Sequence, residues 1–149
     1  MSGSKVKAFG ICLYKYNNAK IEILLCKAVS SLNKWGCLKG VLDKNESNQQ
    51  CAQREFLEES GLYVNILDFE EYFEQHNEEK DIGIWLVNYD KVPNVESYFE
   101  NDQLLDKHLC CENSMVKFFN LDNLPDIRSK QSSLVAYLTD FLRSKNQPL

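Results

Sequence analysis

Apolar and polar positions alternate along the start of the chain with the two-residue period of a β-strand. Within Lys5–Tyr16 every second position, beginning at Val6, is apolar or small, so we expect a strand there. Residues 16–20, Tyr-Asn-Asn-Ala-Lys, are typical of a turn. Ile21–Cys26 is again mostly apolar, and the two segments together predict a β-hairpin.

The pattern then changes to that of a loop followed by a helix. Residues 28–35 indicate a polar loop that ends at Trp35. Asn45–Asn48 supplies residues that favour the start of a helix, and Gly61 is a natural C-terminal stop. We therefore expect a helix from about Asn48 to Ser60.

Short apolar and polar segments follow one another in the second half of the chain. We expect a strand within Leu62–Phe73, a polar turn at residues 74–81 and a strand at Ile82–Tyr89, which is rich in β-forming residues. From Lys91 to Ser114 the pattern is weak. This stretch indicates a long loop with a short helix near Glu100–Lys107.

The last part of the chain combines a short strand at Met115–Asn120 with an amphipathic helix. The helix is indicated by apolar residues at helical spacing, namely Leu134, Leu138, Phe141 and Leu142. Strands and helices in this order predict a mixed α/β fold. The length of the chain is that of a single domain covering residues 1–149.

The composition indicates a soluble globular protein. Apolar residues make up 44% and charged residues 26% of the 149 positions, and no apolar run reaches the length of a membrane span. Residues 1–5 lack the apolar core of a signal peptide, so we expect a cytoplasmic protein with no membrane partner. The six cysteines include no C-x-x-C pair and are expected to be reduced and partly buried.

The charge balance restricts the ligands. With 17 basic and 22 acidic residues, the net charge is −5, which argues against a surface that grips long duplex nucleic acid. A phosphorylated nucleotide, or only the 5′ end of an RNA, is easier to reconcile with this balance. The lysines at 34, 39 and 44 are a candidate basic patch for phosphate groups.

Three carboxylates share one face of the predicted helix. Glu55, Glu58 and Glu59 lie within about 100° of arc, where like charges oppose helix formation. Hard divalent cations prefer carboxylate oxygens, and Mg²⁺ is usually bound by one or two of them together with substrate phosphates. The cluster therefore indicates a Mg²⁺ or Mn²⁺ site. The alternative is a solvated acidic helix face, which is common in proteins.

The segment around this cluster resembles the Nudix box, the signature of the Nudix hydrolase family, whose form is G-x5-E-x7-R-E-U-x-E-E-x-G-U with U a bulky apolar residue. At average residue usage, seven fixed positions coincide by chance in about one in a hundred million starts, so the resemblance is specific. Phe56 and Leu62 fill the two apolar positions. The fixed positions are Gly40, Glu46, Arg54, Glu55, Glu58, Glu59 and Gly61.

The resemblance implies a mixed β-sheet sandwiched between α-helices, and hydrolysis of a phosphoanhydride bond in a nucleoside polyphosphate. It also implies roles for the box residues. Glu55, Glu58 and Glu59 would bind the metal together with the carbonyl of Gly40. Arg54 would pair with Glu46 and brace the loop against the helix; the alternative is a surface pair with Glu58.

Two further candidates lie outside the fixed positions of the box. The run Trp35-Gly36-Cys37-Leu38-Lys39-Gly40 resembles the W-x-x-P-K-G stretch of diadenosine polyphosphate hydrolases, with Leu38 in place of proline. It implies that Lys39 and Trp35 contact the substrate; alternatively, Lys39 is an exposed strand-edge lysine. Glu112 precedes a segment where many family members place another catalytic glutamate, and is otherwise an ordinary loop residue.

These observations predict a metal-dependent pyrophosphohydrolase with Glu58, Glu55 or Glu112 as the general base. Dinucleoside polyphosphates or the 5′-polyphosphate end of an RNA are the favoured substrates, followed by simple nucleoside triphosphates. The alternative is a nucleotide-binding sensor on the same fold. Such proteins usually lack box glutamates, and this chain has all of them. The resemblance permits a monomer or a homodimer.

Overall fold

The computed structural model describes residues 5–30 and 32–145. Its described strands form one sheet in the order β5-β6-β1-β2-β9-β8-β7, with β3 paired to β2 and β4 to β1. The strands are β1 (Val6–Asn17), β2 (Lys20–Ala28), β3 (Trp35–Gly36), β4 (Leu38–Val41), β5 (Tyr72–His76), β6 (Lys80–Asn88), β7 (Phe99–Glu100), β8 (Gln103–Leu104) and β9 (Asn113–Asn120). The helices are α1 (Asn48–Ser60) and α2 (Ser132–Lys145), with 3-10 turns at Ile66–Asp68, Tyr89–Lys91, Val95–Tyr98, Asp106–His108, Leu121–Asn123 and Ser129–Gln131.

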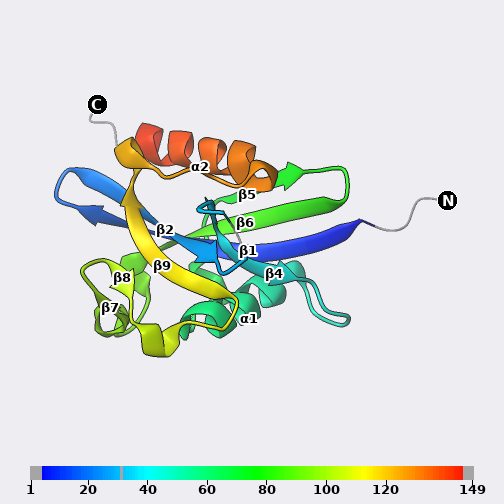
Figure 1. The fold of residues 1–149 in the computed structure, drawn as a ribbon, viewed down its shortest axis with the longest axis horizontal. Coiled ribbons are helices and arrows are strands. Elements are labelled where there is room, and N and C mark those ends of the chain that lie inside the picture. Colours follow the sequence, from blue (N-terminus) through cyan, green and yellow to red (C-terminus); the bar gives the residue numbers. More distant parts are fainter. Residues whose placement is uncertain (1–4, 31, 146–149) are drawn as a thin grey trace.

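The two helices cover opposite faces of the sheet, α1 on one side and α2 on the other (Figure 1). Side chains of β1 alternate between two apolar clusters, because successive residues of a strand point to opposite faces. Ile11 and Leu13 pack with the α1 side, whereas Cys12 and Tyr14 pack with the α2 side. The predicted fold class, a mixed sheet between helices, is confirmed.

The sheet is mixed because β1 runs parallel to β6 and antiparallel to both β2 and β4. The expected β1–β2 hairpin is present. β4 pairs with the first half of β1, with Gly40 opposite Phe9. This pairing holds the residues that lead into α1 against the centre of the sheet.

Local signals set the ends of α1, and the helix has the predicted bounds. The Ser47 hydroxyl accepts a hydrogen bond from the Gln50 backbone N–H at 3.0 Å, and the Gln50 side chain accepts one from the Ser47 N–H at 2.8 Å. This reciprocal pair is a capping box. Gly61 ends the helix with φ 79°, the left-handed conformation that glycine adopts without strain. Phe56 of the box is fully buried beneath the helix.

The prediction of a strand within Leu62–Phe73 is wrong for most of that segment. Leu62 and Val64 are buried, but they lie in irregular backbone before the 3-10 turn at Ile66–Asp68. The strand β5 begins only at Tyr72 and extends through residues that we expected to form a polar turn. It lies at the edge of the sheet and has alternating half-buried and exposed positions, so its polar sequence carries little apolar signal.

The prediction of a short helix near Glu100–Lys107 is also wrong. β7 and β8 form a tight antiparallel hairpin there, and only Asp106–His108 is a 3-10 turn. Asn101 and Asp102 between the strands both have positive φ, 52° and 64°. Two such residues define the hairpin turn whose twist matches that of β-strands. The predicted C-terminal helix is confirmed as α2.

Among the residues described, no helix is both long enough and apolar enough to cross a membrane. The six cysteines are unpaired. Four of them are buried, Cys110 is half-buried and Cys111 is exposed, which agrees with the expectation of reduced, partly buried thiols.

Candidate active site

Arg54 on α1 is the centre of the polar network around the box. Its Nε–H donates to Glu46 Oε2 at 3.0 Å and its Nη2–H donates to Glu46 Oε1 at 2.7 Å. The guanidinium also donates to the carbonyl of Val41 at 3.1 Å. Arg54 therefore ties the loop after β4 to the helix, as the predicted brace requires.

The same guanidinium contacts two of the acidic residues on the helix. Its Nη1 lies 3.1 Å from Glu55 Oε2 and 3.3 Å from both carboxylate oxygens of Glu58. The predicted bracing pair with Glu46 and the alternative pair with Glu58 are thus both present. Arg54 orients Glu55 and Glu58 from one side while it holds the loop from the other.

The charges of this network shift the pKa values of its members. The hydrogen bonds from Arg54 lower the pKa of Glu46 to about 2, and those to Glu46 raise the pKa of Arg54. Glu46 is therefore ionised at neutral pH, and the pair behaves as a charge-assisted two-pronged bond.

Gly40 allows the carboxyl group of Glu55 to lie against the backbone of β4. A Cβ atom added to Gly40 would overlap the carboxyl atoms of Glu55. Any other residue at this position would push the Glu55 side chain away from the Gly40 carbonyl. The glycine that opens the box is therefore required by a close approach rather than by an unusual φ.

Glu59 points from α1 toward the start of β9. Its Oε1 accepts a hydrogen bond from the Asn113 side chain at 3.1 Å. The pKa of Glu59 is raised to about 7, mainly by burial and also by the charges of Glu55 and Glu112, against the opposing effects of the Asn113 hydrogen bond and the charge of Lys39. The folded protein thus holds a carboxyl group whose negative charge is not fully compensated by its neighbours.

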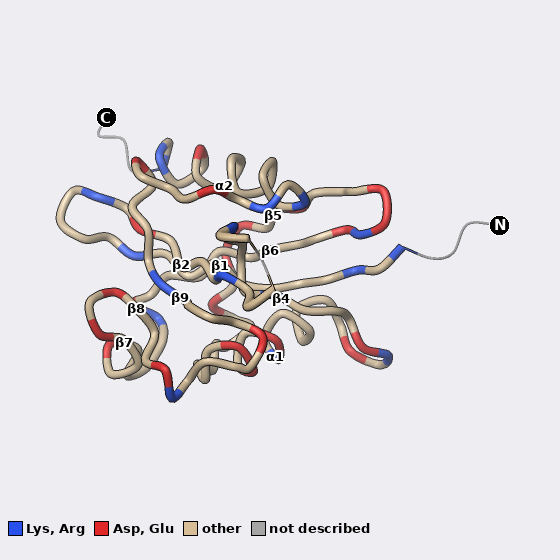
Figure 2. Tube along the Cα trace, in the orientation of Figure 1, with Lys and Arg blue, Asp and Glu red and all other residues tan. Residues whose placement is uncertain are grey.

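Glu112 belongs to the same electrostatic environment. It is exposed, immediately precedes β9, and its backbone carbonyl accepts a hydrogen bond from Val29 at 2.8 Å. The pKa of Glu55 is raised by burial and then by the charges of Glu58 and Glu112. The charge of Glu112 therefore reaches the acidic side of α1, whose Asp and Glu positions are red in Figure 2, and its role as a ligand or base stays a prediction.

These carboxylates suit a divalent cation by their chemistry. They are hard oxygen donors, and their mutual repulsion would be relieved by a bound Mg²⁺ or Mn²⁺. Within residues 5–30 and 32–145, however, no three side chains of His, Cys, Asp or Glu are gathered as closely as a bound ion holds its ligands. Glu58, whose side chain is 55% exposed, is held by Arg54 on one side and is open to solvent on the other.

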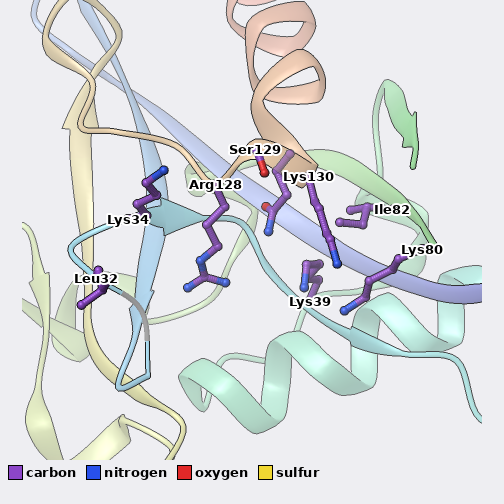
Figure 3. Close-up of a pocket in the computed structure, with 9 residues that line it drawn as sticks. Leu32, Lys34, Lys39, Lys80, Ile82, Arg128, Ser129 and Lys130 are labelled. Atoms are coloured by element: carbon purple, nitrogen blue, oxygen red, sulfur yellow. The ribbon is translucent and has the colours of Figure 1, made fainter. Parts of the chain in front are cut away.

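Lys39 lies beside this acidic region and lines a cavity of about 340 Å³ (Figure 3). It is half-buried, and burial followed by the charge of Lys80 lowers its pKa. Trp35, in contrast, is only 6% exposed and packs edge-on against Phe119 with ring centroids 4.7 Å apart. The structure places Trp35 in the core, and its contact with substrate stays a prediction.

Sequence reasoning missed several residues that surround the site. The basic side chains of Lys80, Arg128 and Lys130 line the same cavity as Lys39, and Asn113 holds Glu59. They come from segments far apart in the chain. The sequence shows that these residues are polar or charged, but it does not show that they lie close together.

The large mixed sheet between two helices, with an arginine-braced acidic helix after a glycine, defines the Nudix class of α/β domain. The chain belongs to the Nudix family, because the family model for the NUDIX domain matches residues 5–138.

Individual relatives agree with this assignment. An asymmetrical bis(5′-nucleosyl)-tetraphosphatase from Caenorhabditis elegans is 29% identical over 102 residues, which are 64% of this chain and 74% of that protein. A crystal structure of a C. elegans Ap4A hydrolase binary complex superposes with a TM-score of 0.60 at 24% identity, covering 93% of this chain and 98% of that one. The NUDIX domain of Shewanella oneidensis NrtR, complexed with ADP ribose, has a TM-score of 0.65 at 14% identity, covering 98% and 91%. The two structures show that the fold is shared.

Proposed function

We propose that this protein hydrolyses a phosphoanhydride bond of a nucleoside polyphosphate with the help of Mg²⁺ or Mn²⁺. The chain is a Nudix-type pyrophosphohydrolase that acts on phosphoanhydrides. Dinucleoside polyphosphates and 5′-polyphosphate RNA ends are its favoured substrates, with simple nucleoside triphosphates next.

The observation that carries this proposal is the convergence of the box residues on one guanidinium. Arg54 contacts Glu46, Glu55 and Glu58, although Glu46 lies in the loop before the helix. An acidic helix face that was merely solvated would have no need of a half-buried arginine brace or of a glycine fitted to Glu55. The arrangement positions carboxylates rather than dispersing them.

The residues that would hold the metal are Glu55, Glu58, Glu59, Glu112 and the carbonyl of Gly40. When bound, the cation supplies Lewis acidity toward the phosphoryl oxygens and lowers the pKa of a bound water. Arg54 orients Glu55 and Glu58 during this process, and its contact with Glu46 keeps the loop in place.

The protein itself must also accept a proton from the attacking water. Glu58 is the candidate that we favour, because it is exposed to solvent while Arg54 holds it next to Glu55. Glu55 is a second candidate, and Glu112, just before β9, is a third. Lys39 would bind a phosphate oxygen and offset charge on the phosphate chain.

The preference for long phosphate chains has two supports. The C. elegans relative is by name a tetraphosphatase of bis-nucleosyl substrates, and Lys39-Gly40 occupies the position at which the box begins. The alternative is a sensor that binds a nucleotide without cleaving it. We disfavour this alternative because every fixed glutamate of the box is present.

A substrate panel tests the proposal. Cleavage is measured by chromatographic identification of the products, with and without Mg²⁺, on diadenosine tetraphosphate, triphosphate-ended RNA, ATP and ADP-ribose, for the wild type and for Glu58→Gln. We expect Mg²⁺-dependent cleavage whose rate falls at least about 100-fold in Glu58→Gln. The control Glu78→Gln removes an exposed carboxylate from the β5–β6 turn and should keep full activity.

Two outcomes of the panel oppose the proposal. Tight nucleotide binding with no cleavage of any substrate would identify a sensor. Cleavage that persists unchanged in Glu58→Gln and without metal would place the chemistry elsewhere. A rate on RNA ends well above that on diadenosine tetraphosphate would assign the enzyme to RNA ends.

A further inference from the structure

The cavity beside Lys39 is lined by five basic side chains and no acidic one. The cations come from three regions of the chain: the loop and β4 after β2, the start of β6, and the segment before α2. They are Lys34, Lys39, Lys80, Arg128 and Lys130. Figure 3 shows the side chains of Lys39, Lys80 and Lys130 pointing toward one another, an arrangement that positive charges avoid unless an anion separates them.

Arg128 is the least satisfied member of this group. Its Nε and Nη2 atoms are buried and have no hydrogen-bond partner among the described residues. Buried donors are nearly always paired, and an unpaired one carries a large desolvation cost. In the part of the chain that the structure describes, no salt bridge involves Arg128, Lys39, Lys80 or Lys130.

The segment that carries Arg128 and Lys130 is held in place by other parts of the fold. Gln131 is buried, and its side-chain oxygen accepts a hydrogen bond from the Cys37 N–H at 2.7 Å. The side chain of Asn77 donates to the Lys130 carbonyl at 3.0 Å. Both basic side chains therefore extend from a fixed backbone, which is the condition for a preformed binding site.

Lys39 connects the cavity to the acidic helix. Its neighbour Gly40 lies against the carboxyl group of Glu55 on α1. On its other side, Lys39 lines the cavity together with Lys80 and Arg128. A phosphate chain that reaches from the carboxylates past Lys39 would enter the basic cavity directly.

We infer that this cavity is a second phosphate subsite, in which Arg128 and Lys130 bind a phosphate group beyond the two that are joined by the anhydride cleaved at the acidic helix. The inference rests on the proposed function and sharpens it. A substrate that fills both places needs a chain of at least three phosphates, so the cavity selects dinucleoside polyphosphates and triphosphate ends over diphosphate-linked compounds such as ADP-ribose.

The direct test is calorimetric titration with tripolyphosphate in the absence of metal. It uses the wild type, Lys130→Gln, Arg128→Gln and the control Lys91→Gln. Lys91 is exposed and follows the opposite end of β6 from Lys80, so its substitution removes the same charge away from the cavity. We expect Lys130→Gln and Arg128→Gln each to weaken binding about three- to tenfold, and Lys91→Gln to bind like the wild type.

Kinetics supply a second readout. On diadenosine tetraphosphate, Lys130→Gln should raise KM with little change in kcat, because it removes binding that ground state and transition state share. On ADP-ribose the same variant should match the wild type. Lys130 is exposed, so its substitution leaves the core intact. Arg128→Gln is compared with the wild type at a temperature at which thermal unfolding shows both proteins to be fully folded.

The inference is overturned if Lys130→Gln and Arg128→Gln bind tripolyphosphate as tightly as the wild type. It is also overturned if Lys91→Gln weakens the binding of tripolyphosphate as much as these two variants do. Failure of the proposed function looks different. In that case the wild type would bind tripolyphosphate through the cavity and hydrolyse none of the panel substrates.

Discussion

Arg54 and Glu46 form a two-pronged ion pair across eight residues of sequence, with donor–acceptor distances of 3.0 and 2.7 Å. The pair joins the loop after β4 to the middle of α1. Because the remaining guanidinium nitrogen, Nη1, reaches both Glu55 and Glu58, the geometry of the acidic face depends on a contact that lies outside it.

Glu46→Gln should lower stability in a pH-dependent way. The folded-state pKa of Glu46 is about 2, below its ordinary value of 4.5. Its ionisation therefore stabilises the fold above about pH 4.5, and this contribution is lost as pH falls toward 2. Urea unfolding at pH 7 should show a loss of about 1–2 kcal/mol relative to wild type, and a smaller difference at pH 3. A difference that stays constant between these pH values would argue against the ion pair.

Gly40→Ala should impair catalysis with little loss of stability. The added methyl group overlaps the Glu55 carboxyl group, which is the far end of a flexible side chain and can swing aside. The free energy of unfolding should therefore fall by less than about 1 kcal/mol, whereas kcat falls because Glu55 leaves its position. Thermal unfolding and kcat on the best substrate are measured in parallel. A variant with wild-type kcat would show that the approach of Glu55 to the backbone has no catalytic use.

Gln131→Ala should destabilise the protein and loosen the basic cavity. It leaves the buried Cys37 N–H without its acceptor, which costs about 1–3 kcal/mol. Tripolyphosphate affinity should fall as well, because Arg128 and Lys130 flank the same backbone. The matched control is Gln49→Ala on the exposed side of α1, for which we expect stability within about 0.5 kcal/mol of wild type. Equal stability of the two variants would contradict the proposed anchoring role.

The sequence predicted well those elements whose position is set by residues close to them in the chain. The bounds of α1 follow from the Ser47 cap and the Gly61 stop, both of which act within a few residues. β1 was recognisable because it is rich in apolar residues, and the structure buries residues 8–14 on both faces of the sheet. In contrast, β5 is an exposed edge strand, and its position is set by pairing with β6 rather than by its own composition.

The residues of the candidate site also fall into two groups, those whose association is local in the sequence and those that only the tertiary structure brings together. Gly40, Glu46, Arg54 and the three box glutamates lie within one short segment, so their spacing alone indicated shared chemistry. The cavity depends on Lys80 and Arg128, which tertiary structure brings to Lys39 from separate segments. The Asn101-Asp102 turn is a different case, because its residues favour a hairpin and the signal was present but overlooked.

The central claim is that the acidic turn of α1 binds divalent ions for phosphate chemistry. Calorimetric titration of Mn²⁺, with a non-hydrolysable ATP analogue present, tests it in the wild type, in the double variant Glu55→Gln and Glu58→Gln, and in the control Glu78→Gln. We predict Mn²⁺ uptake by the wild type and the control, and affinity at least about tenfold weaker in the double variant. Equal uptake by all three proteins, or none by the wild type, would contradict the account.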